Sequence, residues 1–589
     1  MTYKAPLRDM QFVLYEVLNG DQVLPSLPGF EDSTREIMDA VLTEGAKLAE
    51  NVMAPLNMPG DREGCQYDPE TKTVTTPKGF REAYQQFAEN GWTALSSPVE
   101  YGGQGLPHTL NTLAEEMVCS ANLSLGMYPG LTHGAINALL SYGSDELKNK
   151  FLPQLISGEW TGTMCLTEPH CGTDLGLIRT KAEPQADGSH AISGTKIWIT
   201  GGEHDLADNI VHLVLAKLPD APGGSKGISL FLVPKFLDDG SRNPAFCGGL
   251  EHKMGIKGSA TCVMNFEQAK GWLIGEPHKG LQAMFVMMNS ARLMVGLQGL
   301  GIAEAAYQTS LEFAKDRRQS RSLAGPQEPD QAADCIIVHP DVRRMLLRQK
   351  AIIEGGRALA YFTAMQLDVS QHGASEEDRE HADDMVQLLT PVVKAFLTDE
   401  GFFCANDGLQ LMGGNGFTQD WPVEQYVRDS RITRIYEGTN GIQALDLVGR
   451  KLGMAGGRPL KRFFAMLESY CKENEGAPHI GELKAAMAKL QKATMWLMQN
   501  GMTDREQAGS AATPYLRLMA LTSLAYFWSR MALTAREQLD NGTTETDFYQ
   551  AKLNSAEFYM AKILPQSSAL MSEIESGKDS LMAMTLAQF

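Results

Sequence analysis

Apolar residues recur at helical spacing through the first part of the chain. Residues 34–53 carry such a stripe, and Ser33 with Glu36 has the pattern of a capping box at the start of the predicted helix. Pro55 is expected to end that helix. Three further segments show the same spacing, 79–92, 109–122 and 131–157. The pattern therefore predicts a helical unit from about 30 to 160.

The spacing and type of the apolar residues change between about 160 and 270. Short β-branched and apolar runs alternate there with Gly, Pro and Asp, which is typical of an antiparallel sheet. The runs are AISGTKIWIT (191–200), NIVHLVLAKL (209–218), GISLFLVPKF (227–236) and TCVMNFE (261–267). This part of the chain is predicted to be a β domain.

Helical spacing returns from about 280 to 450, interrupted by the polar segment 319–334. The Gly-rich stretch GMAGGRP (453–459) indicates a linker, and 514–537 beyond it is apolar almost all round, as in a buried helix. The resulting division is an N-terminal extension 1–33, a helical domain 34–160, a middle β domain 161–280, a helical bundle 281–452 and a further helical domain 460–589.

Composition narrows the class of protein. The formal charge is −19, which disfavours nucleic acid and anionic membranes as partners because both attract a basic face. The nine cysteines are an odd number without a C-x-x-C pair, so neither a disulfide framework nor a zinc site is predicted. No secretory signal and no apolar run of about 18 residues is visible, and a cytoplasmic protein is expected.

Several familiar catalytic and cofactor-binding motifs are incomplete or absent in this sequence. Gly299-Leu300-Gly301 has Glu304 at the third position of the dinucleotide fingerprint and follows a helical pattern, so a Rossmann interpretation is disfavoured. The chain also lacks a G-x-S-x-G elbow, an H-E-x-x-H pair and a Walker A sequence. The methionines at 284, 287, 288 and 294 indicate core packing, or an adaptable pocket.

Three segments carry more chemical information. MCLTEPHCGTDLG (164–176) offers backbone N–H groups and hydroxyls suited to polar ligands, or else a capped turn. In KIWITGG (196–202), Trp198 and Thr200 are expected on one face of a strand. There they offer either an aromatic wall and a hydrogen-bond donor to a ligand, or ordinary packing in the core of the sheet. Glu437, between an apolar run and the turn 438–441, becomes a usable base if it is desolvated, although a solvated carboxylate is the commoner case.

Taken in order, these segments closely resemble the acyl-CoA dehydrogenase family of flavoproteins. The resemblance runs from about 35 to 450 through VEYGGQGLP (99–107), CLTEPHCGTD (165–174), KIWITGG, HKMGIKGSAT (252–261), NSAR (289–292) and IYEGTNGIQ (435–443). It implies an α+β fold with helical, antiparallel β and helical-bundle domains, here with an extra C-terminal helical domain.

The resemblance also implies bound FAD. Residues matching flavin contacts are Met164, Leu166, Thr167, Gly172, Thr173, Trp198, Thr200, Thr439 and Gly441. The adenosine diphosphate is usually held by the neighbouring subunit, here through Arg317, Gln319, Gln410 and Gly414. Ser320 and Arg321 replace a common Phe and Gly, and Gly441 replaces a frequent Gln, so the contacts there depart from the family pattern.

Glu437 matches the family's catalytic base, which removes the α-proton of an acyl-CoA thioester while a β-hydride passes to the flavin. Thr173, Asn289, Arg292, Gly438 and Tyr128 are the expected substrate contacts. Tyr128, Leu131, His133 and Phe285 either shorten and polarise the acyl tunnel or pack against another helix.

The chain exceeds the usual family length at both ends, as in an enlarged bacterial subgroup, and a homodimer is expected. The favoured substrate is 3-methylmercaptopropionyl-CoA, from dimethylsulfoniopropionate breakdown, with medium- or long-chain fatty acyl-CoA as the alternative. Electron-transfer flavoprotein is the expected acceptor, and an oxidase using oxygen is the rival of the same fold. A non-catalytic helical interaction protein is the rival of another class.

Overall fold

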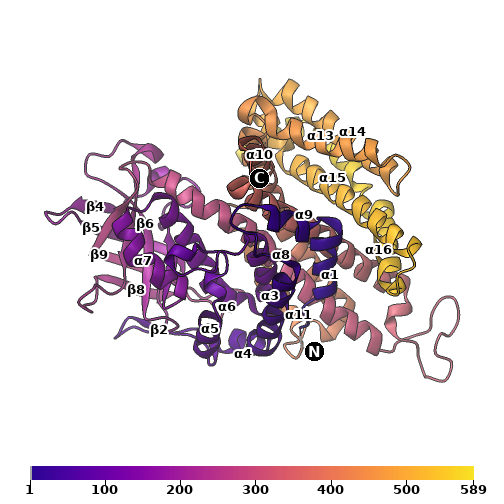
Figure 1. Ribbon diagram of the computed structural model, residues 1–589, viewed down its shortest axis with the longest axis horizontal. Coiled ribbons are helices and arrows are strands. Elements are labelled where there is room, and N and C mark those ends of the chain that lie inside the picture. Colours follow the sequence, from indigo (N-terminus) through magenta and orange to yellow (C-terminus); the bar gives the residue numbers. More distant parts are fainter. Residues whose placement is uncertain (1–2) are drawn as a thin grey trace.

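The computed structural model describes residues 3–589, with the side chains of 289 and 290 left out. Figure 1 shows the strands gathered at one end of the molecule, long helices in the middle and the C-terminal helices at the other end. This arrangement confirms the predicted α+β fold. None of the described helices is both long and apolar enough to span a membrane.

The N-terminal part is mainly helical. Its elements are α1 (Leu7–Gln11), α2 (Gly20–Val23), α3 (Arg35–Leu48), α4 (Asn57–Glu63), β1 (Gln66–Asp68), β2 (Thr73–Thr75), α5 (Phe80–Glu89), α6 (His108–Tyr142) and α7 (Asp145–Ser157). The cap of α3 is Thr34 rather than Ser33, because the Thr34 hydroxyl accepts from the Ile37 N–H. Pro55 does not end the helical path: it lies in a 3-10 turn that leads directly into α4.

A seven-stranded sheet follows in the order β3-β6-β4-β5-β9-β7, with β8 paired to β9 and β6 also paired to β7. Its strands are β3 (Trp160–Cys165), β4 (Lys181–Pro184), β5 (His190–Thr200), β6 (Asn209–Lys217), β7 (Ile228–Pro234), β8 (Ala245–Leu250) and β9 (Thr261–Ile274). Most pairings are antiparallel, as predicted, but β3 and β4 pair parallel to β6. Parallel pairing needs a long crossover, and the chain between β3 and β6 contains the loop after residue 165.

The central bundle consists of α8 (Gly280–Asp316), α9 (Pro340–His372), α10 (Glu376–Met412), α11 (Val423–Thr433) and α12 (Asn440–Asp446). Helices α8 and α10 run in the same direction, since Gly296 approaches Val393 and Gly408 approaches Ala306. Their C-terminal ends therefore lie at the same end of the bundle.

The C-terminal helices are α13 (Arg458–Glu473), α14 (Ile480–Trp496), α15 (Arg505–Asp540), α16 (Thr546–Phe558), α17 (Gln566–Glu575) and α18 (Asp579–Met582). Trp528 of α15 is fully buried and donates to the carbonyl of Ala351 on α9 at 3.0 Å, so this block packs on the bundle. The N-terminal extension joins it: Arg8 bonds Glu545 at 3.0 Å and lies 4.1 Å from the Phe548 ring centroid. The two ends of the chain therefore stabilise each other.

Candidate active site

The candidate base, Glu437, stands in a tight turn between α11 and α12. Its φ is 56° and that of Gly438 is 83°, so two consecutive residues are left-handed. Such backbone is costly for a residue other than glycine unless the surroundings impose it. The Thr439 hydroxyl accepts from the Ile442 N–H and caps α12, which ends the turn. The turn thus projects one carboxylate between two helices.

The Glu437 carboxylate is desolvated. Its Oε2 atom is buried and has no hydrogen-bond partner in the described chain. Burial raises the pKa of Glu437 to about 7, while the charges of Arg292 and Lys394 oppose that rise. Its backbone N–H also meets no acceptor among the described residues. The arrangement combines a proton acceptor poised near neutral pH with a free N–H donor.

Asn440 holds this turn in place. Its side-chain amide donates to Ala395 O at 3.1 Å and to Asp399 Oδ1 at 2.9 Å, and its oxygen accepts from Lys394 Nζ at 2.8 Å. Lys394 is fully buried, and burial lowers its pKa to about 7. These partners all come from α10, outside every segment whose sequence motif indicated chemistry.

A buried ion pair shapes the loop after β3. Glu168 bonds the Nζ of Lys196, which is fully buried on β5, at 2.8 Å. The same carboxylate accepts from the N–H groups of Arg179 and Thr180, and Lys196 also donates to Leu166 O at 3.0 Å. The loop is therefore fixed at both ends. The sequence did contain a signal for this ion pair, because Lys196 lies inside the apolar strand KIWITGG and a buried lysine needs a partner of opposite charge.

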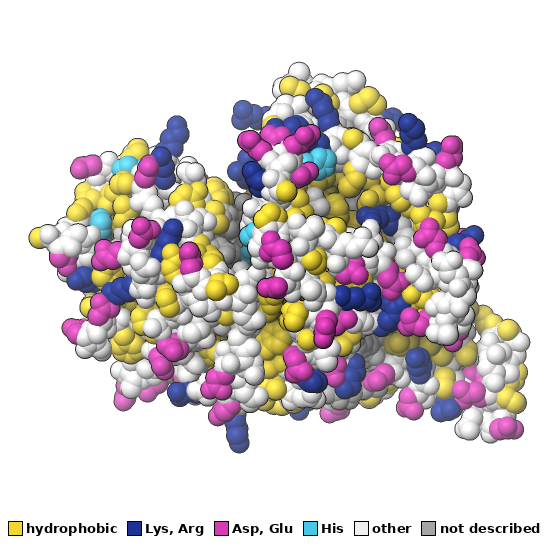
Figure 2. Space-filling model, viewed as in Figure 1, with side chains coloured by type: hydrophobic (Ala, Val, Ile, Leu, Met, Phe, Trp, Pro, Cys, Tyr) yellow, Lys and Arg dark blue, Asp and Glu magenta, His cyan; other side chains and the backbone are white. Residues whose placement is uncertain are grey.

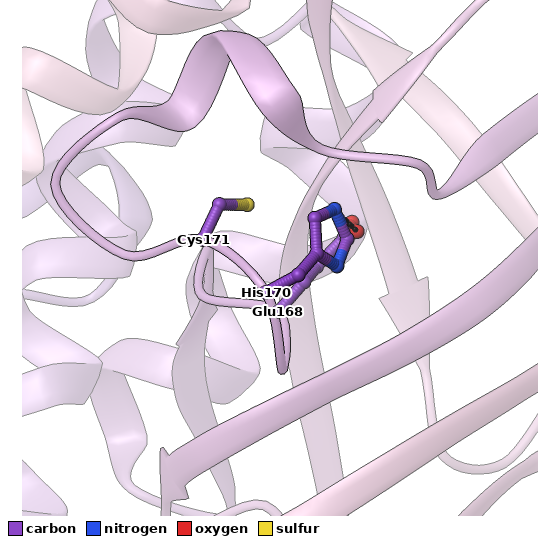
Figure 3. A group of neighbouring side chains, drawn as sticks. All are labelled: Glu168, His170 and Cys171. Atoms are coloured by element: carbon purple, nitrogen blue, oxygen red, sulfur yellow. Dashed lines mark ion pairs between the residues drawn. The ribbon is translucent and has the colours of Figure 1, made fainter.

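Glu168, His170 and Cys171 form a compact group on this loop (Figure 3), with potential ligand atoms within 4.8 Å of one another. The Glu168 oxygens are engaged by Lys196, Thr180 and Arg179, however. His170 Nε2 lies 2.9 Å from the carbonyl oxygen of Leu177, which it can contact only as a donor. Hydrogen bonding within the loop accounts for the geometry of this group.

The residues expected to face the flavin ring come together around this loop. Met164 lies at the end of β3, Leu166 and Thr167 follow, and Gly172 and Thr173 are exposed further along. Trp198 is 60% exposed and has a φ of 60°, in a strand irregularity between Lys196 and Ile199. Ile199 between them is buried, whereas Trp198 is exposed and Thr200 is half-buried, so the expected common face of Trp198 and Thr200 stays a prediction.

These groups fit a flat, polar cofactor such as FAD. The Thr167, Thr173 and Thr200 hydroxyls make no hydrogen bond among the described residues, and the large Trp198 ring is uncovered. An uncovered indole and free hydroxyls offer stacking and hydrogen bonding to an isoalloxazine ring. Thr439 and Gly441, expected near the same cofactor, are exposed at the start of α12.

The residues expected to hold the adenosine diphosphate lie elsewhere. Gln410 and Gly414 flank the C-terminal end of α10, and Arg317 and Gln319 follow the end of α8 at the same end of the bundle. All four are exposed, and a Cβ on Gly414 would meet nothing within 4 Å. Along α10, the rise from Lys394 beside the base to Gln410 is roughly 24 Å, at about 1.5 Å per residue. Within one chain these residues are thus remote from Glu437.

A cleft of about 690 Å³ lies beside Arg292 of α8, and its lining, which does not include Glu437, contains His133 and Asn137 of α6, Gln387 of α10 and Lys451. The Nη1 atom of Arg292 lies 3.6 Å from the Oδ2 atom of Asp446. The positive charge of Arg292 also lowers the pKa of Glu437. The side chain of Asn289 lies outside the described residues. In Figure 2 this face is hollowed between the strands and the C-terminal helices, and acidic and basic side chains are interspersed on it.

Tyr128 fits the packing alternative rather than the tunnel. It is buried, and its hydroxyl accepts from the Ala260 N–H at 2.8 Å and lies 3.2 Å from Gly258 O. His133 is also buried and meets the His108 ring edge-on at 5.4 Å. Gly438, by contrast, adjoins Glu437, and its carbonyl oxygen accepts from Lys394.

Comparison with known proteins gives consistent matches. Models of the acyl-CoA dehydrogenase N-terminal, middle and C-terminal domains match 43–159, 163–269 and 278–452, and a model described as acetyl-CoA dehydrogenase C-terminal like matches 463–585. The chain is 44% identical to 3-methylmercaptopropionyl-CoA dehydrogenase of Ruegeria pomeroyi over 100% of both chains. It is 36% identical to a broad-specificity linear acyl-CoA dehydrogenase of Mycobacterium tuberculosis, also over 100% of both.

Solved structures agree on the fold. Caenorhabditis elegans ACDH-11 in complex with C11-CoA aligns with a TM-score of 0.78 and 18% identity, covering 95% of this chain and 91% of that one. Bacillus anthracis acyl-CoA dehydrogenase complexed with FAD aligns with a TM-score of 0.74 and 22% identity, covering 92% and 88%.

Proposed function

Because the chain belongs to the acyl-CoA dehydrogenase family, we propose that it oxidises 3-methylmercaptopropionyl-CoA. The enzyme catalyses FAD-dependent α,β-dehydrogenation of acyl-CoA. The name of the Ruegeria relative, which is 44% identical over its whole length, supports the choice of substrate. The observation that carries the proposed mechanism is the buried, unpartnered carboxylate oxygen of Glu437.

Glu437 removes the α-proton of the thioester. With a pKa of about 7, it is substantially ionised at neutral pH and yet basic enough to accept a weakly acidic proton. Its own N–H is free to bind the thioester carbonyl, which stabilises the negative charge that develops there. Bound FAD supplies the acceptor for the β-hydride. The product is the trans-2-enoyl-CoA.

The CoA portion occupies the cleft that Arg292 lines. The cationic side chains of Arg292 and Lys451 would meet the anionic end of the ligand in a cleft that Glu115 and Asp383 also line. The cleft also presents amide groups from Asn137 and Gln387. Electrostatic attraction at these side chains opposes the repulsion expected from the net charge.

The active form is a homodimer in which each chain completes the FAD site of the other. The separation of Arg317, Gln319, Gln410 and Gly414 from Glu437 within one chain supports this assembly, because a single cofactor would otherwise have to reach both ends of the bundle. The electron acceptor is an electron-transfer flavoprotein.

An acyl-CoA panel with a dye acceptor tests the function. The compounds are 3-methylmercaptopropionyl-, butyryl-, octanoyl- and palmitoyl-CoA, and the thioether compound is expected to give the highest kcat/KM. A strong palmitoyl preference would overturn the substrate but leave the reaction intact. Hydrogen peroxide formed in stoichiometric amount with the enoyl-CoA would identify an oxidase, and purified protein without flavin absorbance would indicate a non-catalytic protein.

A further inference from the structure

Asp446 is the last residue of α12, the helix that begins just after the candidate base. Its Oδ2 atom is buried, accepts no hydrogen bond and lies 3.6 Å from the Nη1 atom of Arg292 on α8. Its Oδ1 atom accepts a hydrogen bond of 2.5 Å from the Nε atom of Arg450. Arg292 and Asp446 are 6% and 5% exposed. The two side chains thus form a buried ion pair, and the mechanism above gives Asp446 no part.

Arg292 stands between two carboxylates and pairs with one of them. From Thr439, the cap of α12, to Asp446 the helix rises roughly 10 Å, at about 1.5 Å per residue. Burial lowers the pKa of Arg292, and the negative charges of Asp446 and then Glu437 oppose that change. The guanidinium is therefore within electrostatic reach of both carboxylates. In the described part of the chain, however, its ion pair is with Asp446, and the Oε2 atom of Glu437 has no partner.

A direct contact between Arg292 and Glu437 would weaken the base. An opposite charge within about 4–6 Å lowers the pKa of a carboxyl group by roughly 1 to 3. A carboxylate stabilised in this way accepts a proton less readily, and a guanidinium fork would also cover the oxygens that must meet the α-proton. The position of Arg292 beside Asp446 leaves the carboxylate of Glu437 open.

The other charged or titratable groups around the two carboxylates have partners of their own. These groups with their partners are Lys394 with Gly438, Asp399 with Arg434, Tyr436 with Gln298, Lys451 with Gln387, and Asp383 with Gln387. Arg450 pairs with Asp446 itself, and its side chain is 64% exposed. Among the described residues, Asp446 is thus the carboxylate that pairs with Arg292.

We propose that Asp446 is a positioning residue that holds Arg292 away from Glu437 and so leaves the base open to the substrate. Asp446 touches no reacting atom and acts through the arginine. This inference rests on the proposed function only for the role of Glu437 as the base, since the ion pair itself is independent of which acyl-CoA binds.

The test is an infrared titration of the FAD-loaded enzyme without substrate. The carboxyl band of Glu437 is identified by its absence from Glu437→Gln. In Asp446→Asn the arginine is released toward the base, so the midpoint of this band should fall by at least about 1 pH unit. Asp446→Glu retains the negative charge and should stay near wild type. Arg450→Met, which removes the other partner of Asp446, is the matched control and should leave the midpoint unchanged.

A double-mutant cycle shows whether Asp446 acts through Arg292. Arg292→Met alone should raise the midpoint, because a positive charge near the base is lost. Adding Asp446→Asn to this variant should have no further effect. If Asp446→Asn leaves the wild-type midpoint unchanged, or still lowers the midpoint in Arg292→Met, the positioning role is wrong.

The pH profile of flavin reduction provides a second measurement. With 3-methylmercaptopropionyl-CoA, Asp446→Asn should reach half of its maximal rate at a lower pH than wild type, and an equal midpoint would contradict the proposal. Should Asp446→Asn not retain FAD, Asp446→Ala provides the same comparisons. The infrared titration needs no turnover, so its failure is distinct from failure of the proposed function, in which no acyl-CoA bleaches the wild-type flavin.

Discussion

Lys394, buried in the middle of α10, donates a hydrogen bond of 2.8 Å to the carbonyl oxygen of Gly438, the residue that follows the candidate base. One side chain thus both fixes the left-handed turn and places a positive charge near Glu437. The bundle therefore controls the geometry and the proton affinity of the base together.

Replacing the base should separate cofactor binding from chemistry. Glu437→Gln retains a side chain of the same shape, so the variant should still carry FAD. The rate at which substrate bleaches its flavin should fall by about 10²–10⁴-fold, because general-base catalysis contributes on that scale. Stopped-flow absorbance of the flavin measures this loss, and exposed Glu312→Gln on α8 is the control. Near-normal turnover in Glu437→Gln would disprove the assignment.

The pH dependence of flavin reduction should report the same carboxylate. Only ionised Glu437 accepts a proton, so the rate should rise with pH through about 7 and then level off. Stability should change in the opposite direction, because the folded-state pKa lies above the ordinary 4.5 and the folded chain keeps this proton longer. Wild type should therefore lose stability relative to Glu437→Gln between about pH 4.5 and 7, as thermal unfolding at a series of pH values would show.

Lys394→Met should shift this profile. The positive charge of Lys394 lowers the pKa of Glu437, so its removal should move the midpoint of the rate profile to higher pH. Lys394→Arg retains a charge and is the matched control. An unchanged midpoint in Lys394→Met, in protein that still binds FAD, would mean that the lysine acts only by holding the turn.

The loop after β3 should depend on its ion pair. Lys196→Met leaves Glu168 buried without its cation, at a cost of about 3–5 kcal/mol in the free energy of unfolding. The variant should also retain less FAD, since the loop carries expected flavin contacts. Urea unfolding and the flavin-to-protein absorbance ratio measure the two effects. The double variant Lys196→Met/Glu168→Gln should recover part of the stability, and no recovery would show that the lysine contributes by packing alone.

Sequence reasoning succeeded where the information was local. The helix and strand spacing and the family motifs predicted the fold, and IYEGTNG indicated an acidic residue in a turn between helices. Contacts between distant segments were not predictable in this way. Lys394 and Gly438 lie far apart along the chain, as do Gln298 and Tyr436, and no periodic pattern specifies such pairs.

One local error and one irregularity that was not predicted have physical causes. Ser33 and Thr34 are both good caps, and the helix uses the second because its hydroxyl reaches the Ile37 N–H. At Trp198, the ladder between β5 and β9 shifts register just before Ile199, an irregularity that the strand period did not predict. Irregularities of this kind depend on the neighbouring strand β9 and cannot be derived from β5 alone.

The shared FAD site can be tested by mixing two defective chains. Glu437→Gln alone should bind FAD without turnover, and Arg317→Glu alone should bind FAD poorly, because a carboxylate replaces the exposed guanidinium expected to meet the pyrophosphate. In a two-fold dimer formed from equal amounts, half the molecules are mixed, and each of these has one site with an intact Glu437 opposite an intact Arg317. Coexpression should therefore restore about a quarter of wild-type activity. If Arg317 served the flavin of its own chain, no site would contain both residues, and the mixture would remain inactive.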